Sequence, residues 1–264
     1  MELDTIECKY DKGYREYKVG DQWVPSVTSI LRMLEKDAIG LKIWKKKNSP
    51  ERQAYILKYS AEVGELIHYY GMQEMKKTTE RILKQDMPEF LMKTPMGQWK
   101  NYIPYVEIGQ SLFAEFWNLY KTQIRILDIE KVVANLEFGY AGRFDFRFQL
   151  LENGKWINCL GDIKTSKGIY LYDQSNADKF QIQDTEGNQF CSYGDQMATY
   201  NYAIDNWAER YYVLRIHPYY KFRDPLNLYR KGKMEYEFTQ VFGSIENFKL
   251  AHQNFIAKYG DYRE

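Results

Sequence analysis

The stretch that decides the fold is KWINCLGDIKTSK, residues 155–167. Its first half is rich in apolar and β-forming residues, which predicts a buried strand. Side chains two residues apart in a strand point to the same face, so Asp162 and Lys164 should lie side by side while Ile163 points into a core. A carboxylate next to an ammonium group is either a simple ion pair or half of an active site, and the rest of the chain has to decide between the two.

The preceding strand carries a second carboxylate. In GYAGRFDFRFQLLENGKW, residues 139–156, alternation predicts an aromatic face and a charged face. The aromatic face would hold Phe144, Phe146 and Phe148, and the charged face Arg143, Asp145 and Arg147. Asn153-Gly154 is a hairpin-turn signal, and the hairpin would bring Asp145 next to Asp162. Two converging carboxylates repel unless a positive charge lies between them, and a hard divalent cation with oxygen ligands meets that need. Lys164 would then orient an attacking water and offset charge on a phosphate oxygen.

The order of the elements indicates an α/β fold. The first 25 residues alternate loosely and fit a hairpin with a turn at Gly20-Asp21, and Ser26 resembles the N-cap of a following helix. A long amphipathic helix over 50–77 would begin with Ser49 as its cap and Pro50 at its first position. The other elements that periodicity predicts are a helix over 105–122, three strands from 124 to 165, a helix over 192–208, strands over 211–217 and 233–241, and a helix over 244–259.

Composition limits the class of protein. Of the 264 residues 44% are hydrophobic and 28% charged, and the formal net charge is +1, so a nucleic-acid site must come from local clustering. Aromatic residues reach 17%, with 24 tyrosines that could stack on bases. Cys8, Cys159 and Cys191 lack the spacing of a zinc ribbon or an iron–sulfur cluster and indicate a reducing, intracellular setting, with Cys159 filling core. The first residues lack the apolar segment of a signal peptide, and no apolar run approaches the roughly 20 residues of a membrane span, so neither is expected.

Five short motifs follow one another along the chain. They are VPSVTSIL (residues 24–31), Gly64-x-x-x-His68, Gly142-x-x-Asp145, Asp162-x-Lys164-Thr165, and Gln196-x-x-x-Tyr200 on a helix. In this order they resemble the PD-(D/E)xK nuclease superfamily. The resemblance is to its RecB-like phage-type exonucleases and to the mitochondrial genome-maintenance exonuclease, over about residues 24–205. The polar segment 168–191 departs from the family as an insertion, and the sequence leaves its role open.

The resemblance implies a restriction-endonuclease-like core. A helix, three strands, a helix and a strand would form a mixed central sheet flanked by helices, with an N-terminal helical region. One nuclease domain would cover residues 1–264. It would comprise an N-terminal hairpin and helices that contribute His68 (1–123), a catalytic core (124–217), and a C-terminal strand and helix (218–264). The implied cofactor is one or two Mg²⁺ or Mn²⁺ ions, without an iron–sulfur cluster.

The resemblance also implies roles for individual residues. The expected metal ligands are His68, Asp145, Asp162 and the backbone carbonyl of Ile163. The expected catalytic residues are Asp145, Asp162, Lys164, Glu130 and Gln196. Glu137 competes with Glu130 for the role of the upstream acid, and strand parity does not decide between them. The expected DNA contacts are Trp44, Lys45, Lys46, Lys47, Ser166, Lys167 and Tyr200. Structural roles compete with these assignments, because a basic run is usually a solvated face and a helical histidine is often part of a core.

The expected function is divalent-metal-dependent exonucleolytic hydrolysis of DNA, acting on single strands or duplex ends in recombination, repair or replication. The alternatives are a structure-specific endonuclease or nickase, a catalytically silent DNA-binding module with the same fold, and a scaffold for a recombination or replication complex. Besides DNA, a single-strand-annealing or replication protein is an expected partner, and a membrane is not. The expected location is cytoplasmic, which includes a phage-encoded protein in a bacterial host.

Overall fold

The computed structural model describes residues 2–3, 7–11, 13–34, 45–75, 103–165, 193–216 and 236–262. The strands of a large sheet are β1 (Glu2–Leu3), β5 (Ile124–Asn135), β6 (Tyr140–Glu152), β7 (Lys155–Thr165), β8 (Arg210–Ile216) and β9 (Tyr236–Val241). Those of a small sheet are β2 (Cys8–Asp11), β3 (Tyr14–Val19) and β4 (Gln22–Pro25). The helices are α1 (Val27–Leu31), the 3₁₀ turn η1 (Arg32–Leu34), α3 (Pro50–Met75), α4 (Ile103–Tyr120), α5 (Tyr193–Ala203) and α7 (Ile245–Tyr259).

The large sheet is mixed, in the order β1-β5-β6-β7-β8-β9. Consecutive strands from β5 to β7 pair antiparallel, β8 pairs parallel with β7, and β9 closes the sheet antiparallel to β8. The parallel pair needs a crossover, and α5 lies on it. The chain order α4, β5, β6, β7, α5, β8 is the predicted order of helix, three strands, helix and strand, so the predicted fold class is confirmed.

Local signals in the sequence account for several element ends. The Ser26 side chain caps α1 by accepting from the backbone N–H of Ser29 at 3.1 Å. The Ser49 hydroxyl accepts from the Arg52 N–H at 3.3 Å at the start of α3. Asn153 and Gly154 have φ values of 48° and 77°, the left-handed pair that a tight hairpin turn requires. The predicted caps and turn are therefore confirmed.

The helix predicted over 192–208 is shorter than expected, because α5 ends at Ala203. The Asn201 side chain accepts from the Ala208 N–H at 2.7 Å and donates to the Ala208 carbonyl at 2.9 Å. These two bonds hold the backbone at Ala208 next to Asn201, so the chain turns instead of continuing as a helix. Asp205 and Asn206 adopt left-handed φ values of 57° and 55°, which a helix cannot accommodate. Hydrogen bonds from a side chain to the backbone compete with the hydrogen bonds of the helix, and the hydrophobic periodicity of the sequence gives no sign of them.

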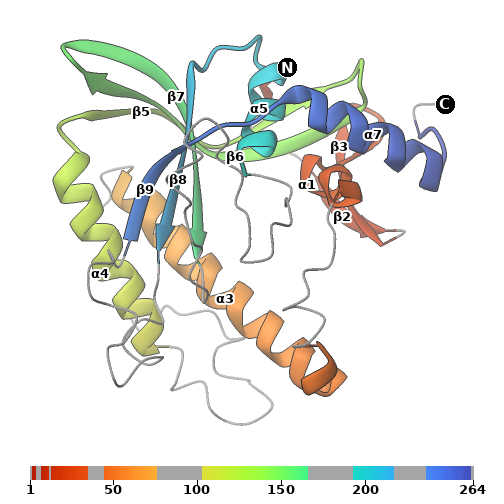
Figure 1. The fold of residues 1–264 in the computed structure, drawn as a ribbon, viewed down its shortest axis with the longest axis horizontal. Helices are drawn as coiled ribbons and strands as arrows, with labels where there is room; N and C mark the ends of the chain where they lie inside the picture. Colours follow the sequence, from red (N-terminus) through yellow and green to blue (C-terminus); the bar gives the residue numbers. More distant parts are fainter. Residues whose placement is uncertain are drawn as a thin grey trace.

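Helices cover the large sheet on both faces (Figure 1). One core lies between the sheet and helices α3 and α4, and its centre includes Ile67, Phe113 and Phe148. A second core lies between the sheet and helices α1, α5 and α7, with Ile30, Tyr140 and Phe248 at its centre. The buried Cys159 belongs to the first core, as predicted. The small sheet joins β5 and β6 through a third cluster, formed by Tyr17, Val19, Val24, Ala134 and Ala141.

The predicted alternation along β6 is wrong at one point. Phe146 and Phe148 enter the core under α3 and α4, but Phe144, two residues earlier, enters the core under α5 and α7. The neighbouring strand β5 changes cores at the same level, between Ile129 and Val133. Glu130, which lies between them, has a φ of 56°. A left-handed residue inside a strand interrupts the pleat, so counting in twos fails across Glu130 on β5, and the facing part of β6 changes cores at the same level.

Candidate metal centre

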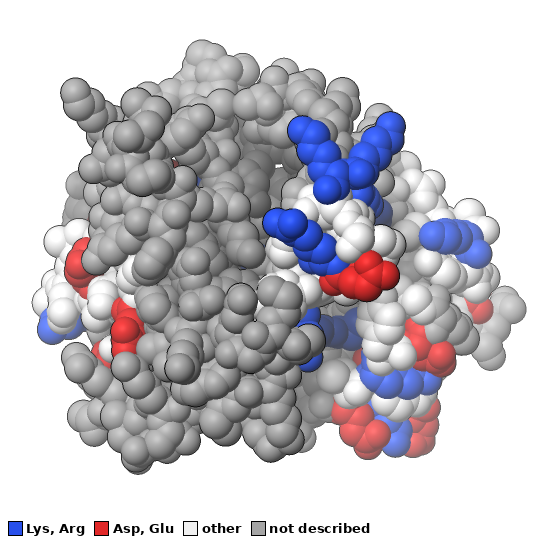
Figure 2. All heavy atoms as spheres, turned by 90° about the horizontal axis from the view of Figure 1, so that it is seen from below, with Lys and Arg blue, Asp and Glu red and all other residues white. Residues whose placement is uncertain are grey.

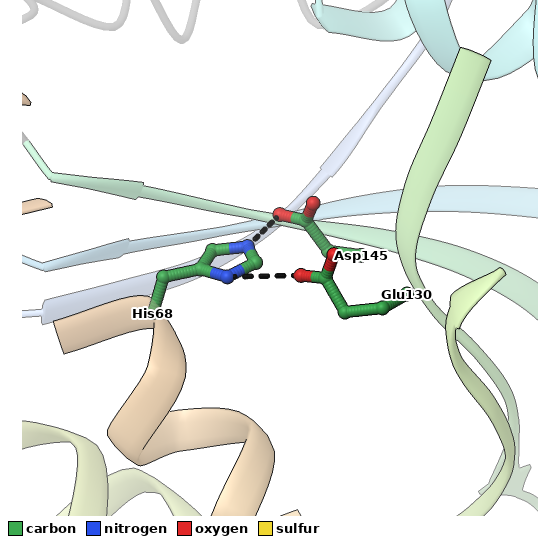
Figure 3. A group of neighbouring side chains, drawn as sticks. All are labelled: His68, Glu130 and Asp145. Atoms are coloured by element: carbon green, nitrogen blue, oxygen red, sulfur yellow. Dashed lines mark ion pairs between the residues drawn. The ribbon is translucent and has the colours of Figure 1, made fainter. Parts of the chain in front are cut away.

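Three side chains from three elements meet at this irregular point of the sheet. His68 of α3 lies between Glu130 of β5 and Asp145 of β6 (Figure 3). The His68 Nδ1 to Glu130 Oε1 distance is 3.1 Å, and the His68 Nε2 to Asp145 Oδ2 distance is 2.8 Å. One ligand atom from each residue lies within 4.8 Å of the others. Carboxylate oxygens suit Mg²⁺, and a site that adds an imidazole nitrogen also suits Mn²⁺. With one nitrogen and two carboxylate oxygens, the cluster therefore fits a divalent metal.

Two glycines allow the helices to approach the sheet at this site. A Cβ on Gly64 of α3 would lie 2.7 Å from Thr165 Oγ1, at the end of β7. A Cβ on Gly142 of β6 would lie 2.4 Å from the ring of Tyr200 on α5. Both distances are shorter than carbon contacts tolerate, so each position needs glycine for close approach. The motif glycines therefore have a packing role, and the first of them sets α3 at the depth from which His68 reaches the carboxylates.

The Asp145 carboxylate lies between two strands. The last residues of β6 and β7 in register are Phe146 and Gly161. Beyond that pair Asp145 Oδ2 accepts the backbone N–H of Ile163 at 2.6 Å. A charge-assisted hydrogen bond of this kind fixes the carboxylate in orientation. The predicted ligand role of the Ile163 carbonyl stays a prediction.

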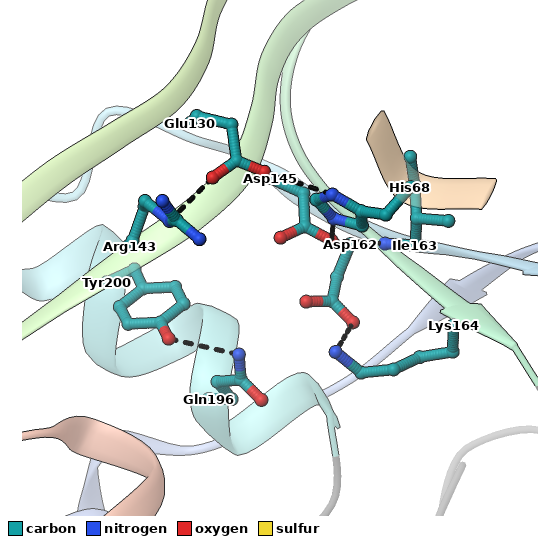
Figure 4. A network of polar contacts seen from close by, with 9 residues as sticks. All are labelled: His68, Glu130, Arg143, Asp145, Asp162, Ile163, Lys164, Gln196 and Tyr200. Atoms are coloured by element: carbon teal, nitrogen blue, oxygen red, sulfur yellow. Dashed lines mark hydrogen bonds and ion pairs between the residues drawn. The ribbon is translucent and has the colours of Figure 1, made fainter. Parts of the chain in front are cut away.

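Asp162 and Lys164 lie on one face of β7, as predicted, and form an ion pair. Asp162 is 2% exposed. The Lys164 Nζ also lies 5.0 Å from the centroid of the Tyr193 ring at the start of α5, a cation–π distance. Figure 4 shows Asp145 and Asp162 next to each other at the centre of the network, with Lys164 beyond Asp162. The two aspartates predicted to converge therefore do so, although Asp162 is paired with Lys164 and lies outside the three-residue cluster.

Burial and charge shift the pKa values of these groups in opposite directions. Burial lowers the pKa of His68, but Asp145 and Glu130 more than offset this and raise it to about 10. Burial, assisted by the charge of Asp145, raises the pKa of Asp162 to about 7 against the opposing effect of Lys164. Burial also acts on Asp145, yet the charges of His68 and Lys164 hold its pKa below the usual value. Such opposed shifts in one place are typical of functional sites.

These pKa values predict that metal binding releases a proton. At pH 8 Asp162 is ionised, but His68, with a pKa near 10, keeps a proton that a metal must displace. We expect about one proton released per Mn²⁺ at pH 8, and an apparent affinity that rises about tenfold per pH unit between pH 7, where Asp162 ionises, and pH 10. Calorimetry in two buffers of different ionisation enthalpy measures the release. The His68→Gln variant should bind Mn²⁺ more weakly and release almost none, and equal release by both proteins would contradict the assignment.

The raised pKa of His68 also makes the stability of the metal-free protein depend on pH. The folded pKa of His68 lies above its ordinary value of 6.5. Its contribution to the free energy of unfolding is therefore fully present below pH 6.5 and is lost as the pH rises through about 10.

The structure distinguishes between the two candidates for the upstream acid. Glu130 lies in the cluster, whereas Glu137 is exposed in the turn between β5 and β6. Glu130 reaches the cluster from a φ of 56°, a region in which a residue other than glycine is strained. Backbone strain kept at such a place is common at functional sites.

Gln196 and Tyr200 occupy one face of α5, and Gln196 Nε2 donates to the Tyr200 hydroxyl at 3.0 Å. Tyr200 is only 3% exposed, and its ring lies against Gly142. A buried ring has no free face for a base, so the structure places Tyr200 in the core instead of on a DNA-binding surface. Gln196 lies beside the aspartates in Figure 4.

Sequence reasoning missed two residues of the site. Tyr193 lies three positions before Gln196 on α5, so helical spacing could have indicated that it shares the same face. Arg143 lies two positions before Asp145 on β6, and its Nε is 2.5 Å from Glu130 Oε2. The alternation of side chains along the strand had indicated only that Arg143 lies on the charged face.

The basic run predicted to bind DNA lies far from the cluster. Lys45, Lys46 and Lys47 are exposed just before α3, and Gln53 Nε2 donates to the Lys45 and Asn48 carbonyls at 2.8 Å each. Pro50 and His68 are 18 positions apart on α3, which is about 27 Å of helix. Figure 2 shows that, among the described residues on the face seen from below, Lys and Arg side chains are interspersed with Asp and Glu. A DNA contact by these lysines stays a prediction.

Other predicted residues lie outside the described part of the chain. They are Trp44, Ser166, Lys167 and the segment 168–191.

No protein-family model matches the chain, and no curated protein matches it significantly. Among similar solved structures is one from Eubacterium rectale named "Putative exonuclease", with 12% identity, a TM-score of 0.35, and coverage of 73% of this chain and 63% of that one. The chain thus spans less than two thirds of that protein. Another is SSO0001, with 12% identity, a TM-score of 0.25, and coverage of 73% and 84%. Both TM-scores are too low to indicate a function for this chain.

Proposed function

We propose that this chain is a divalent-metal-dependent DNA exonuclease of the PD-(D/E)xK type. The observation that carries the proposal is the meeting of His68, Glu130 and Asp145, with the buried Asp162–Lys164 pair beside them. His68, Asp145, Asp162 and Lys164 stand in the sequence motifs, and Glu130 is one of the two candidates for the upstream acid that the resemblance implies. The proposal extends to one domain over residues 1–264 and to single strands or duplex ends as substrate.

The residues of the site have separate tasks in the proposed reaction. His68, Glu130 and Asp145 would hold the metal, with Asp162 and the Ile163 carbonyl as further proposed ligands. When bound, a divalent metal supplies a Lewis acid for the phosphate and the attacking water. The Ile163 N–H keeps the Asp145 carboxylate in orientation. Lys164, held by Asp162 and the Tyr193 ring, orients the water and offsets negative charge as the 3′-oxygen leaves.

Buried charge speaks against a catalytically silent module. Asp162 is 2% exposed and Asp145 lies between two strands, and the burial of such charges is costly unless they are paired or bind a metal. A fold needed only for DNA binding could carry apolar side chains here at lower cost. The retained set of charges therefore supports an active enzyme.

End-labelled linear and circular single-stranded DNA, incubated with Mg²⁺, Mn²⁺ or EDTA, tests the proposal. We expect linear DNA to be degraded with either metal and to survive in EDTA, while circular DNA stays intact because it has no end. Cleavage of circles would identify an endonuclease or nickase. The absence of cleavage of any substrate in both metals, with specific DNA binding retained, would leave the silent module.

None of the described helices is both long and apolar enough to cross a bilayer. A role in recombination, repair or replication, with a single-strand-annealing or replication protein as partner, belongs to the same proposal. Copurification of such a protein with the intact chain would support it.

A further inference from the structure

Arg143 lies at the rim of the cluster of His68, Glu130 and Asp145, and none of the described residues contacts its terminal nitrogens. Its Nε is 2.5 Å from Glu130 Oε2, and its side chain is 53% exposed. Among the described residues Glu130 is its one partner. A guanidinium donates through Nε and through a planar fork of terminal nitrogens, so the fork of Arg143 remains available. Such a fork matches the oxygens of a phosphate.

The next arginine on the same strand provides a contrast. Arg147 is 17% exposed, and its Nε and Nη2 both lie 2.5 Å from Asp128 Oδ2. Its guanidinium also lies over the Trp207 ring at 5.2 Å. Arg147 is thus held on several sides, whereas in the described part of the chain Arg143 is held at Nε alone.

Arg143 and Lys164 lie on opposite sides of the two aspartates (Figure 4). Arg143 is beyond Glu130, and Lys164 is beyond Asp162. In an in-line displacement the attacking water and the leaving oxygen occupy opposite sides of the phosphorus. If Lys164 orients the water, a cation across the cluster lies on the side of the leaving oxygen.

We propose that Arg143 binds a substrate phosphate on the leaving-oxygen side of the site, while its Nε keeps Glu130 in orientation. The inference rests on the proposed nuclease function and adds a phosphate contact that the sequence motifs do not assign. One guanidinium then joins a metal-holding carboxylate to the DNA backbone. Because the Glu130 contact already restricts the side chain, less conformational entropy is lost when phosphate binds.

The test measures DNA binding separately from cleavage. Fluorescence anisotropy with end-labelled linear single-stranded DNA is recorded with saturating Mg²⁺ in the Lys164→Ala background, where the strand should stay intact. We expect Arg143→Gln to weaken binding about tenfold or more and to reduce the slope of log K against log salt by about 0.7, the contribution of one phosphate on a single strand. Arg143→Lys should keep the slope but bind more weakly than the background, because an ammonium lacks the fork.

Arg125→Gln is the matched control. Arg125 is also exposed on the large sheet, but it contacts Gln149 and the Trp156 ring. Its loss changes the net charge equally and should leave affinity and slope unchanged. In the active protein the same comparison should appear in the KM, with about a tenfold increase for Arg143→Gln and none for Arg125→Gln. Thermal unfolding checks that the variants are folded.

The outcomes separate the two proposals. If Arg143→Gln retains the affinity, the salt slope and the KM while the parent cleaves linear DNA, the Arg143 contact is refuted and the nuclease function stands. If the parent neither binds nor cleaves DNA with Mg²⁺ or Mn²⁺, the nuclease function fails and the inference falls with it.

Discussion

Replacing Lys164 by alanine is expected to lower the rate of metal-dependent DNA cleavage about 10³-fold, with Mn²⁺ binding retained. The Lys164 ammonium is the positive group that pairs with buried Asp162, and it lies over the Tyr193 ring, so its position is determined from two sides. Single-turnover cleavage of end-labelled linear DNA measures the loss, and calorimetry with Mn²⁺, at a pH above the raised pKa of Asp162, measures the retained binding. Loss of cleavage with unchanged metal affinity would identify a residue that acts in the reaction.

Loss of Lys164 also leaves Asp162 without its counter-ion. Lys164 lowers the pKa of Asp162, which burial raises to about 7, so its removal should raise that pKa further. The variant should then be most stable below pH 7, where Asp162 can bind a proton, and the stability difference from the parent should grow at higher pH. Lys155→Ala, at the exposed start of the same strand, is the control and should cleave at the parental rate. A parental cleavage rate in Lys164→Ala would eliminate the proposed role.

Asp145→Asn is expected to abolish cleavage and weaken Mn²⁺ binding by more than about 100-fold. The amide keeps the shape of the side chain and can still accept from the Ile163 N–H, which Asp145 binds at 2.6 Å. It lacks the charge that a metal needs and that holds the proton on His68. The variant therefore removes the negative charge of the Asp145 side chain while it changes the packing little.

The histidine ring reports this change directly. Asp145 is the leading cause that raises the pKa of His68 to about 10 against the effect of burial, so the pKa should fall in Asp145→Asn. The chain has 3 histidines, and a His68→Gln spectrum identifies the relevant signal in an NMR titration. Asp128→Asn is the control, since Asp128 pairs with Arg147 and should leave metal binding and the His68 pKa unchanged. An unchanged His68 pKa in Asp145→Asn would show that the contact seen here does not exist in solution.

Local patterns in the sequence were sufficient to predict most of the helices and strands. The apolar periods, the caps at Ser26 and Ser49 and the Asn153-Gly154 turn are local, because each depends on neighbours within a few residues. They predicted the order of helix, three strands, helix and strand, and the shared face of Asp162 and Lys164. The motifs, through their resemblance to a nuclease superfamily, also narrowed the set of candidate site residues.

Contacts between distant residues were decided by the tertiary structure alone. Three features lie next to the left-handed Glu130 of β5. They are the position of Glu130 in the cluster in place of Glu137, the change of core between Phe144 and Phe146, and the guanidinium of Arg143. Strand parity is reliable only while every residue keeps extended φ and ψ angles, and the left-handed Glu130 ends that condition. No local pattern reveals such a residue, since it persists only because packing from α3, β5 and β6 together compensates its strain.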